Sequence, residues 1–286
     1  MKKSHSAFSL IELSIVILII GILIAGITQS SRLVKQFRLS SARTITQSSP
    51  VASITGLILW LEPTLENSFL AAEAEDETQL STWNDINPQS ITKNNFTKTA
   101  SAVFTYEEDA TNGVPALECS GANTTDQLTG SLITSPNNYF TLFVVSKQSA
   151  STNNTIQRSL FNIGSGNGFT YMKDVTTGAR DLIYQGVVAR TSGTAFTLNN
   201  EISSITYGAS GSGVLSTLFI NGASSTITSP TTGMSTPSTG INAIIGSGWM
   251  GTISEVIMFD RALKASERHD VESYLSKKYG IAVVVN

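Results

Sequence analysis

The sequence has little of the material from which most catalytic and metal sites are built. Its 286 residues include one cysteine, Cys119, and two histidines, His5 and His269. A single cysteine excludes an intramolecular disulfide and any cysteine-based zinc cluster. With two histidines far apart in the chain, imidazole-rich metal sites and most Ser-His-Asp arrangements have few residues to draw on. We therefore expect a protein that is not an enzyme.

Charge is also scarce. Charged residues make up 14% of the chain, and the net charge is −3, whereas typical soluble domains are roughly 25% charged. Nucleic-acid-binding proteins usually carry a clustered basic face, so we expect no nucleic-acid partner. Ser, Thr, Asn and Gly are abundant instead, which makes the surface polar mainly through hydroxyls and amides. Such a surface is typical of an exported β protein.

The N-terminus carries a short basic segment followed by a long apolar one. Lys2 and Lys3 precede an apolar segment at residues 8–28. About 20 residues in a helix span roughly 30 Å, the thickness of the hydrocarbon core of a bilayer. Lysines in front of the segment predict that its front end lies in the cytoplasm and the bulk of the chain outside.

Inside this apolar segment lies one carboxylate, Glu12. An unpaired charge in the middle of a bilayer is costly, so it needs a partner or a function. The surrounding sequence, Ala7-Phe8-Ser9-Leu10-Ile11-Glu12-Leu13, resembles the processing site of type IV prepilins and type II secretion pseudopilins. The resemblance implies that a peptidase cuts between Ala7 and Phe8, that the new amine is methylated and that Glu12 is retained. The family usually has Gly where this chain has Ala7.

The resemblance also implies partners and a location. Residues 1–7 form a leader, and residues 8–49 form one helix that Pro50 ends. Glu12 can offer a counter-ion to the Phe8 amine of a neighbouring subunit. The expected partners are the prepilin peptidase/methyltransferase, other pilin or pseudopilin subunits and the inner membrane. We expect a precursor in the bacterial inner membrane with a periplasmic C-terminal domain, which assembles into a pilus, a pseudopilus or another surface structure.

Residues 50–286 predict an antiparallel β protein. Short apolar or alternating runs are separated by clusters of Gly, Asn, Ser and Thr. Asn221-Gly222 is a two-residue hairpin turn signal, and Gly280 is a C-cap for a final helix with an apolar stripe at Val271, Tyr274 and Leu275. The predicted strands are 57–61, 140–145, 159–163, 181–184, 202–207, 215–220, 241–245 and 253–259. Many strands with turn-rich spacing indicate a two-sheet sandwich.

Both ends of this region show a second resemblance. Residues 56–61 with Trp83-Asn84-Asp85, and residues 251–263 with Glu267-Arg268 and residues 274–280, resemble the opening and closing of concanavalin A-like domains of the laminin-G type. The resemblance implies a two-sheet jelly-roll sandwich over residues 50–286 with a short C-terminal helix. It also implies a lectin-like role in binding or adhesion, with a glycan or a surface protein as ligand.

Two features are candidates for chemistry in this domain. The acidic run Glu73, Glu75, Asp76 and Glu77 offers oxygen ligands of the kind that Ca²⁺ prefers. Its alternate glutamates only superficially imitate the Glu-x-Asp-x-Glu strand of glucanases, because the middle residue is Glu and the setting is alanine-rich. Trp249, flanked by glycines, is the tryptophan that we expect to be exposed and able to stack on a sugar ring.

These observations predict a type IV pilin-like subunit, a minor pilin or pseudopilin, that displays a lectin-like head. One alternative is a type II secretion pseudopilus component that contacts exported substrates. Another is a carbohydrate-active enzyme, which the sequence favours least. The sequence does not separate a pilus from a secretion system.

Processing leaves a chemical mark that can be measured. The mature chain is expected to start at Phe8 with a methylated amine, because Ala7 is small and Phe8 begins the matched motif. Mass spectrometry of the N-terminal peptide from the membrane fraction checks this. A chain that keeps Met1, or one that is cut beyond Ile27, would contradict the prepilin interpretation.

Overall fold

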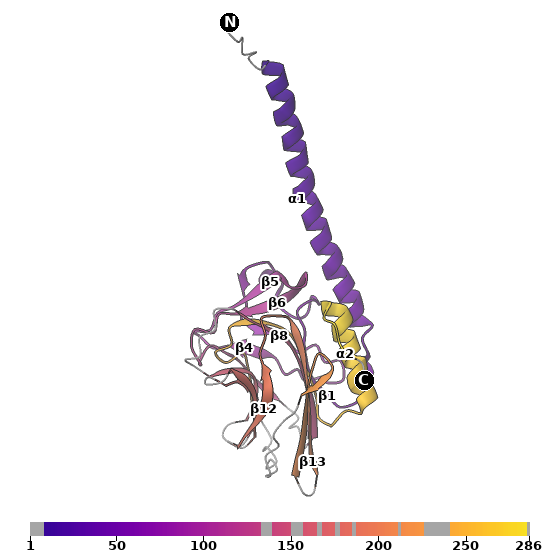
Figure 1. The fold of residues 1–286 in the computed structure, drawn as a ribbon, viewed down its shortest axis with the longest axis vertical. Helices are drawn as coiled ribbons and strands as arrows, with labels where there is room; N and C mark the ends of the chain where they lie inside the picture. The colour runs from indigo at the N-terminus through magenta and orange to yellow at the C-terminus, as the bar shows by residue number, and fades with distance from the viewer. Residues whose placement is uncertain are drawn as a thin grey trace.

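The protein is a long helix that leads into a two-layer β-sandwich, with a second helix against one sheet (Figure 1). The computed structural model describes residues 9–132, 139–149, 157–164, 168–174, 178–184, 187–210, 213–225 and 241–284. All the strand pairs in both sheets are antiparallel over these residues. The predicted fold class, an N-terminal apolar helix, an antiparallel sandwich and a short C-terminal helix, is confirmed.

The N-terminal helix α1 spans Leu10–Gln47 without interruption. Its first half is apolar on every side, and within the described residues it is the one helix long and apolar enough to cross a membrane. It stops three residues before Pro50, which begins the short 3₁₀ helix η1 (Pro50–Ser53). Proline fits the first position of a helix and disfavours helical backbone in the residue before it. The predicted end of the helix is therefore confirmed.

Two sheets form the head. The order of the first, nine-stranded sheet is β15-β14-β13-β8-β17-β6-β5-β2, with β1 also paired to β17, and the order of the second, eight-stranded sheet is β12-β11-β10-β9-β16-β7-β4-β3. The first sheet comprises β1 (Leu57–Leu61), β2 (Thr78–Gln79), β5 (Phe104–Thr111), β6 (Val114–Cys119), β8 (Tyr139–Gln148), β13 (Glu201–Ser210), β14 (Gly213–Ile220), β15 (Ala223–Ser225) and β17 (Gly251–Phe259). The second comprises β3 (Thr82–Trp83), β4 (Phe96–Lys98), β7 (Leu128–Leu132), β9 (Arg158–Ile163), β10 (Phe169–Lys173), β11 (Ala179–Tyr184), β12 (Val187–Ala195) and β16 (Ile241–Ile245).

All eight predicted strands form, although several extend beyond their predicted ends. The predicted Asn221-Gly222 turn joins β14 to β15, with φ of 51° and 77° at its two residues. The prediction omitted other strands, including β5 and β10. In β5 the acidic residues Glu107, Glu108 and Asp109 interrupt the apolar alternation, so the period-two signal is weak there.

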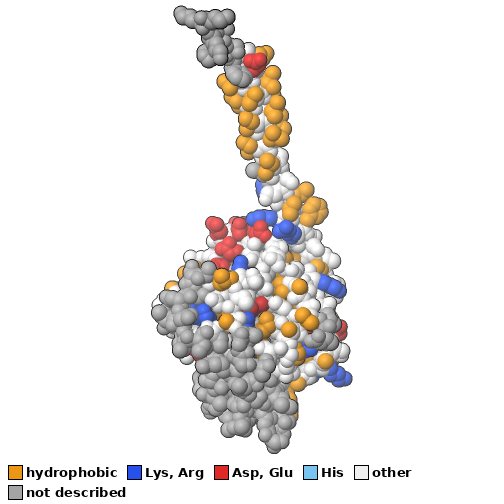
Figure 2. Space-filling view, viewed as in Figure 1, with side chains coloured by type: hydrophobic (Ala, Val, Ile, Leu, Met, Phe, Trp, Pro, Cys, Tyr) orange, Lys and Arg blue, Asp and Glu red, His pale blue; other side chains and the backbone are white. Residues whose placement is uncertain are grey.

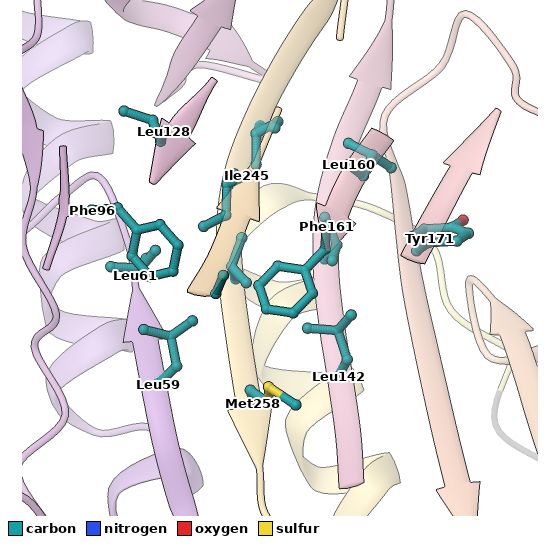
Figure 3. Close-up of a cluster of buried hydrophobic side chains, with 14 of the residues drawn as sticks. Leu59, Leu61, Phe96, Leu128, Leu142, Leu160, Phe161, Tyr171, Ile245 and Met258 are labelled. Atoms are coloured by element: carbon teal, nitrogen blue, oxygen red, sulfur yellow. The ribbon is translucent and has the colours of Figure 1, made fainter. Parts of the chain in front are cut away.

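The main core lies between the two sheets. Side chains from β1, β8 and β17 face those from β4, β9 and β16 (Figure 3). Residues shown there are Leu59, Leu61, Phe96, Leu128, Leu142, Leu160, Phe161, Tyr171, Ile245 and Met258. The alternation of each strand sends every second side chain into this layer, and burial of large apolar side chains is the main source of stability.

A second core lies on the outer face of the first sheet. Helix α2 (Ala265–Tyr279) covers this face with Val271, Tyr274 and Leu275, which confirms the predicted apolar stripe. The last turns of α1 join the same cluster through Ala42, of which 2% is exposed. The end of α1 and the start of the sandwich therefore share one packed core.

The two ends of α2 are fixed by hydrogen bonds and backbone geometry. Glu267 Oε2 accepts the N–H of Lys264 at 2.9 Å, and its carboxylate also pairs with Arg261. At the other end, Gly280 has φ of 62° and caps the helix in the left-handed conformation, as predicted.

The shared core predicts where a stable soluble fragment must begin. A fragment of residues 50–286 is expected to lose about 2 kcal/mol of unfolding free energy relative to residues 39–286, because it lacks the buried part of α1. Urea unfolding followed by circular dichroism measures the difference. A fragment of residues 30–286 is the control, and its stability should equal that of 39–286 because residues 30–38 add only exposed contacts. Equal stability of all three fragments would contradict the shared core.

Candidate functional site

The first half of α1 exposes its large apolar side chains in the described residues. Its large apolar side chains from Leu10 to Ile27 are at least 47% exposed, and Leu10 reaches 86%. Figure 2 shows apolar side chains along this part of the helix, above the head. A surface this large and apolar needs lipid or other helices around it.

Glu12 lies in the first turn of this apolar helix. Its Oε2 accepts the Ser9 N–H at 2.9 Å, where a carboxylate also interacts favourably with the helix dipole. From Ser9 onward, no cation lies within ion-pair distance of Glu12 in the described residues. The predicted processing residues Ala7 and Phe8 lie outside the described residues, so cleavage and the predicted pairing with the Phe8 amine stay predictions.

At its other end the helix is held to the head by a buried charge network, which we call the junction: Glu62, Glu255, Tyr274, Lys278 and Tyr279. Lys278 Nζ donates to Glu62 Oε2 and to Glu255 Oε2, each at 2.8 Å. The side chains of Lys278, Glu62 and Glu255 are fully buried. The network therefore joins the end of β1, the middle of β17 and the last turn of α2.

Each carboxylate of the junction has further donors. Glu62 accepts the backbone N–H groups of Thr64 and Leu65, at 2.9 and 2.6 Å, and the Ser68 hydroxyl at 2.8 Å. Glu255 accepts the indole N–H of Trp60 at 2.8 Å. A buried charge is tolerated when hydrogen bonds and an opposite charge replace its hydration.

The two tyrosines complete the junction and connect it to α1. The hydroxyls of Tyr274 and Tyr279 donate to Glu255, each at 2.8 Å. The Tyr274 hydroxyl also lies 3.3 Å from Thr46 Oγ1 on α1. The last turn of the membrane-type helix thus contacts the same network that ties the head together.

Glu62 and Lys278 of the junction are held in their ionised forms. Burial alone raises the pKa of Glu62, but Lys278 and the hydrogen bonds from Thr64 and Leu65 hold that pKa below its ordinary value of 4.5. Burial lowers the pKa of Lys278, but Glu255 and Glu62 hold it above 10.5. The stabilisation is therefore present between about pH 4.5 and 10.5 and is lost as pH falls through the lowered Glu62 pKa or rises through the raised Lys278 pKa.

Exposed ion pairs flank α1 where it meets the head. Lys35 Nζ lies 3.6 Å from Glu108 and 3.9 Å from Asp76, and Arg38 lies 3.6 Å from Asp109. Figure 2 shows these acidic side chains gathered beside the basic ones of the helix. Exposed pairs contribute little free energy, so the position of α1 on the head depends mainly on the buried contacts of its last turns.

The acidic run predicted to hold Ca²⁺ does not form a metal site. Glu73 Oε1 accepts the Ser81 N–H and hydroxyl, at 3.2 and 2.6 Å, and Asp76 Oδ1 accepts the Glu108 N–H at 2.9 Å. The described part of the chain contains no group of three or more His, Cys, Asp or Glu side chains able to hold a metal. The predicted ligands Glu73, Glu75, Asp76 and Glu77 do not form such a group. Glu73 and Asp76 are held by separate partners, along a turn that includes η2 (Ala71–Glu73) and a left-handed Glu77.

The prediction that Trp249 is exposed is wrong. Its side chain is fully buried, and its ring packs edge to face on Phe196 at 5.1 Å. Gly248 and Gly251, with φ of 61° and 132°, permit a turn that sends the ring into the core. Trp249 therefore offers no platform for a sugar.

The residues of the junction were not predicted from the sequence, although one signal was present. Lys277 and Lys278 both lie in the last turn of α2, where a cation commonly serves the negative end of the helix dipole. The helical period instead puts Lys278 on the stripe of Tyr274 and Leu275, one turn further on. A lysine on an apolar stripe needs a buried counter-charge, and Glu62, next to the buried strand β1, supplies one.

A second buried ion pair lies between the sheets. Arg180 donates to Glu201 Oε2 at 2.7 Å and to the Tyr171 hydroxyl at 3.0 Å. Its guanidinium lies 4.1 Å from the centre of the Phe196 ring. This pair fixes one end of the sandwich interior next to Trp249.

Comparisons with known proteins give two findings. Residues 2–28 match the family described as the prokaryotic N-terminal methylation motif. The chain thus carries the methylation motif of type IV prepilins, which supports a pilin- or pseudopilin-like subunit made as an inner-membrane precursor and processed by a prepilin peptidase. A search of curated proteins gives no match.

The second finding concerns the fold. The chain is similar to the binding domain of botulinum neurotoxin serotype D (TM-score 0.54, 12% identity, covering 76% of this chain and 51% of that one). It is also similar to the binding domain of Paraclostridial Mosquitocidal Protein 1 (TM-score 0.53, 14% identity, covering 78% of this chain and 52% of that one). A third similar structure is a Trypanosoma rangeli sialidase in complex with the inhibitor DANA (TM-score 0.51, 13% identity, covering 85% of this chain and 39% of that one). The chain spans about half or less of these structures, and such low identity shows a shared sandwich fold alone.

Removing the ammonium tests the junction. Lys278→Met is expected to lower the free energy of unfolding by about 3 to 5 kcal/mol, because two buried carboxylates lose their counter-charge. Lys277→Met, one residue earlier and exposed, is the matched control and should change it by less than about 0.5 kcal/mol. Thermal and urea unfolding of both variants measures the difference. Equal effects would mean that the junction does not stabilise the head.

Proposed function

We propose that the protein is a minor pilin or pseudopilin that assembles through α1 and displays the sandwich as a lectin-like binding head. One observation carries the proposal. Helix α1 is one unbroken helix. Its N-terminal half exposes apolar side chains, and its last turns pack into the core of the head. A membrane anchor that only tethered the head would need no such rigid connection.

The length of α1 fits this role. Its 38 residues correspond to roughly 57 Å at 1.5 Å per residue. The first half is long enough to span a bilayer, and the second half holds the head away from the lipid. Leu33, Val34 and Phe37 stay exposed beyond the membrane-type segment, which supports packing of α1 against helices of other subunits.

The head supplies the binding function in this proposal. Its sandwich is the kind of scaffold implied by the resemblance to concanavalin A-like, laminin-G-type domains, and its loops are free to carry specificity. A head this large favours a minor or tip position over that of a repeated major subunit. The ligand is a glycan or a surface protein, and the acidic run supplies no converged carboxylate pair that would support glycoside hydrolysis.

A type II secretion pseudopilus component would use the same helix. Electron microscopy of cells with a labelled head separates the two roles. Label along or at the tips of surface fibres supports a pilus, whereas label confined to the envelope supports a secretion system.

Glu12 is the residue by which assembly can be tested. Glu12→Leu is expected to leave membrane insertion intact, since a charge is removed from the apolar segment, while incorporation into filaments falls by about tenfold because this segment loses its one ionisable side chain. Sheared surface fractions and membrane fractions are compared by immunoblot beside wild-type partners.

Ser14→Leu is the matched control for Glu12→Leu. Ser14 bonds only to the Ile11 carbonyl of its own helix, at 2.8 Å, so this variant should assemble at wild-type levels. Normal assembly of the Glu12 variant would show that the carboxylate does not direct assembly. The chain would then be interpreted as a membrane-tethered protein.

A further inference from the structure

The outer face of the first sheet is only partly covered by helix. α2 lies over Phe143, Val145 and Ile257. Beyond it, one row of polar side chains crosses three neighbouring strands. Thr252 of β17 is paired with Glu118 of β6 on one side and with Lys147 of β8 on the other.

The pleat of the strands fixes the direction of this row. Leu117, Cys119 and Ile253 point into the core between the sheets, so their neighbours Glu118 and Thr252 point outward. The row therefore forms the floor of an open groove on the outer face of the head.

We call this feature the outer groove. It consists of two adjoining hollows of about 350 and 410 Å³, which share Lys147 and Leu198. Glu118 and Thr252 line the first hollow, and asparagines line the second. Volumes of this size are typical of small-ligand sites.

Two polar atoms in the outer groove have no hydrogen-bond partner among the residues that the structure describes. Thr252 Oγ1 is one of them, in a residue that is 6% exposed. Asn200 Oδ1 is the other, although the amide nitrogen of Asn200 donates to Asn112 Oδ1 at 3.2 Å. A buried hydroxyl or amide oxygen without a partner is unfavourable, and here both lie in the lining of the same groove.

The chemistry of the lining restricts the ligand. Glu118 and Lys147 carry opposite charges on the two sides of Thr252, which favours a ligand without net charge. Burial raises the pKa of Glu118, as does Glu107, while Lys147 lowers it. The carboxylate of Glu118 accepts hydrogen bonds, the ammonium of Lys147 donates them, and the hydroxyl of Thr252 can do either. This set matches neighbouring hydroxyl groups of a ligand, each of which can also donate and accept.

The remaining lining agrees with such a ligand. Leu198 is 53% exposed between the two hollows and offers an apolar surface to the C–H face of a ring. Strands β6, β8 and β17 all lie inside the sheet, so their backbone groups are already paired and an added peptide strand has no edge to join. Recognition must therefore use side chains.

We propose that the outer groove binds a neutral oligosaccharide through Glu118, Thr252 and Lys147, with Leu198 against a sugar ring. The partly exposed Lys147 side chain moves aside to admit a ligand hydroxyl to Thr252 Oγ1. This inference rests on the proposed function in one respect, namely that the head is a binding domain.

The test uses purified full-length protein in detergent micelles. The probe is an array of neutral oligosaccharides of glucose, galactose, mannose and N-acetylglucosamine, followed by calorimetric titration with the best binder. Thr252→Val is expected to weaken binding by about tenfold, while its melting temperature stays equal or rises because the hydroxyl has no partner to lose. Glu118→Gln and Lys147→Gln are expected to weaken binding as well.

Thr170→Val is the matched control, since Thr170 lies on β10 of the opposite sheet, and it should bind as the wild type does. The absence of binding to any oligosaccharide would overturn the proposal, and so would unchanged binding by Thr252→Val. Because the assay needs no filament, failure of the groove is distinct from failure of Glu12-dependent assembly.

Discussion

The structure depends on one ammonium group held between two buried carboxylates. Glu62 follows the first strand of the head, Glu255 lies in the last strand, and Lys278 comes from the final helical turn. Each ion alone would be expensive to desolvate, so each requires the others to be in place. The junction therefore selects one arrangement of β1, β17 and α2, and Tyr274 extends that selection to α1.

The packed connection between α1 and the head fixes how the head is oriented relative to the exposed apolar half of α1. A flexible link would let the head turn freely on the membrane segment. Here Ala42 and Thr46 are buried against the head, and Thr46 contacts the junction through the Tyr274 hydroxyl. The orientation of the helix thus fixes the orientation of the head, which an assembly with a regular arrangement of subunits requires.

Much of this arrangement follows from local sequence patterns. The helix end at Pro50, the Asn221-Gly222 turn and the Gly280 cap each depend on a backbone preference of a few residues, and each was predicted. β5 was missed because its outward acidic residues mask the alternation. The fold class could be predicted because the apolar pattern that identifies a helix or a strand lies within a few neighbouring residues.

The candidate sites were harder to predict because they depend on residues distant in sequence. Trp249 has glycine neighbours typical of an exposed turn, yet the ring of Phe196, the residue that follows β12, packs against it. The carboxylates near Glu73 are close in sequence, but Ser81, Glu108 and Lys35 draw them apart. Glu62 and Lys278 show the reverse case, since no local pattern relates two residues separated by 216 positions.

That separation has a consequence for the order in which the head forms during synthesis. The ribosome makes β1 and Glu62 early, but the strand that pairs with β1 and the ammonium that neutralises Glu62 come from the last part of the chain. Such long-range contacts form late, since a long loop must first be closed. A nascent chain thus leaves β1 without its partner strand until β17 is made, and it leaves the Glu62 carboxylate without its counter-charge until Lys278 of α2 is made. The early part of the head therefore reaches its buried, charge-compensated state only after residues from the last part of the described chain have joined it.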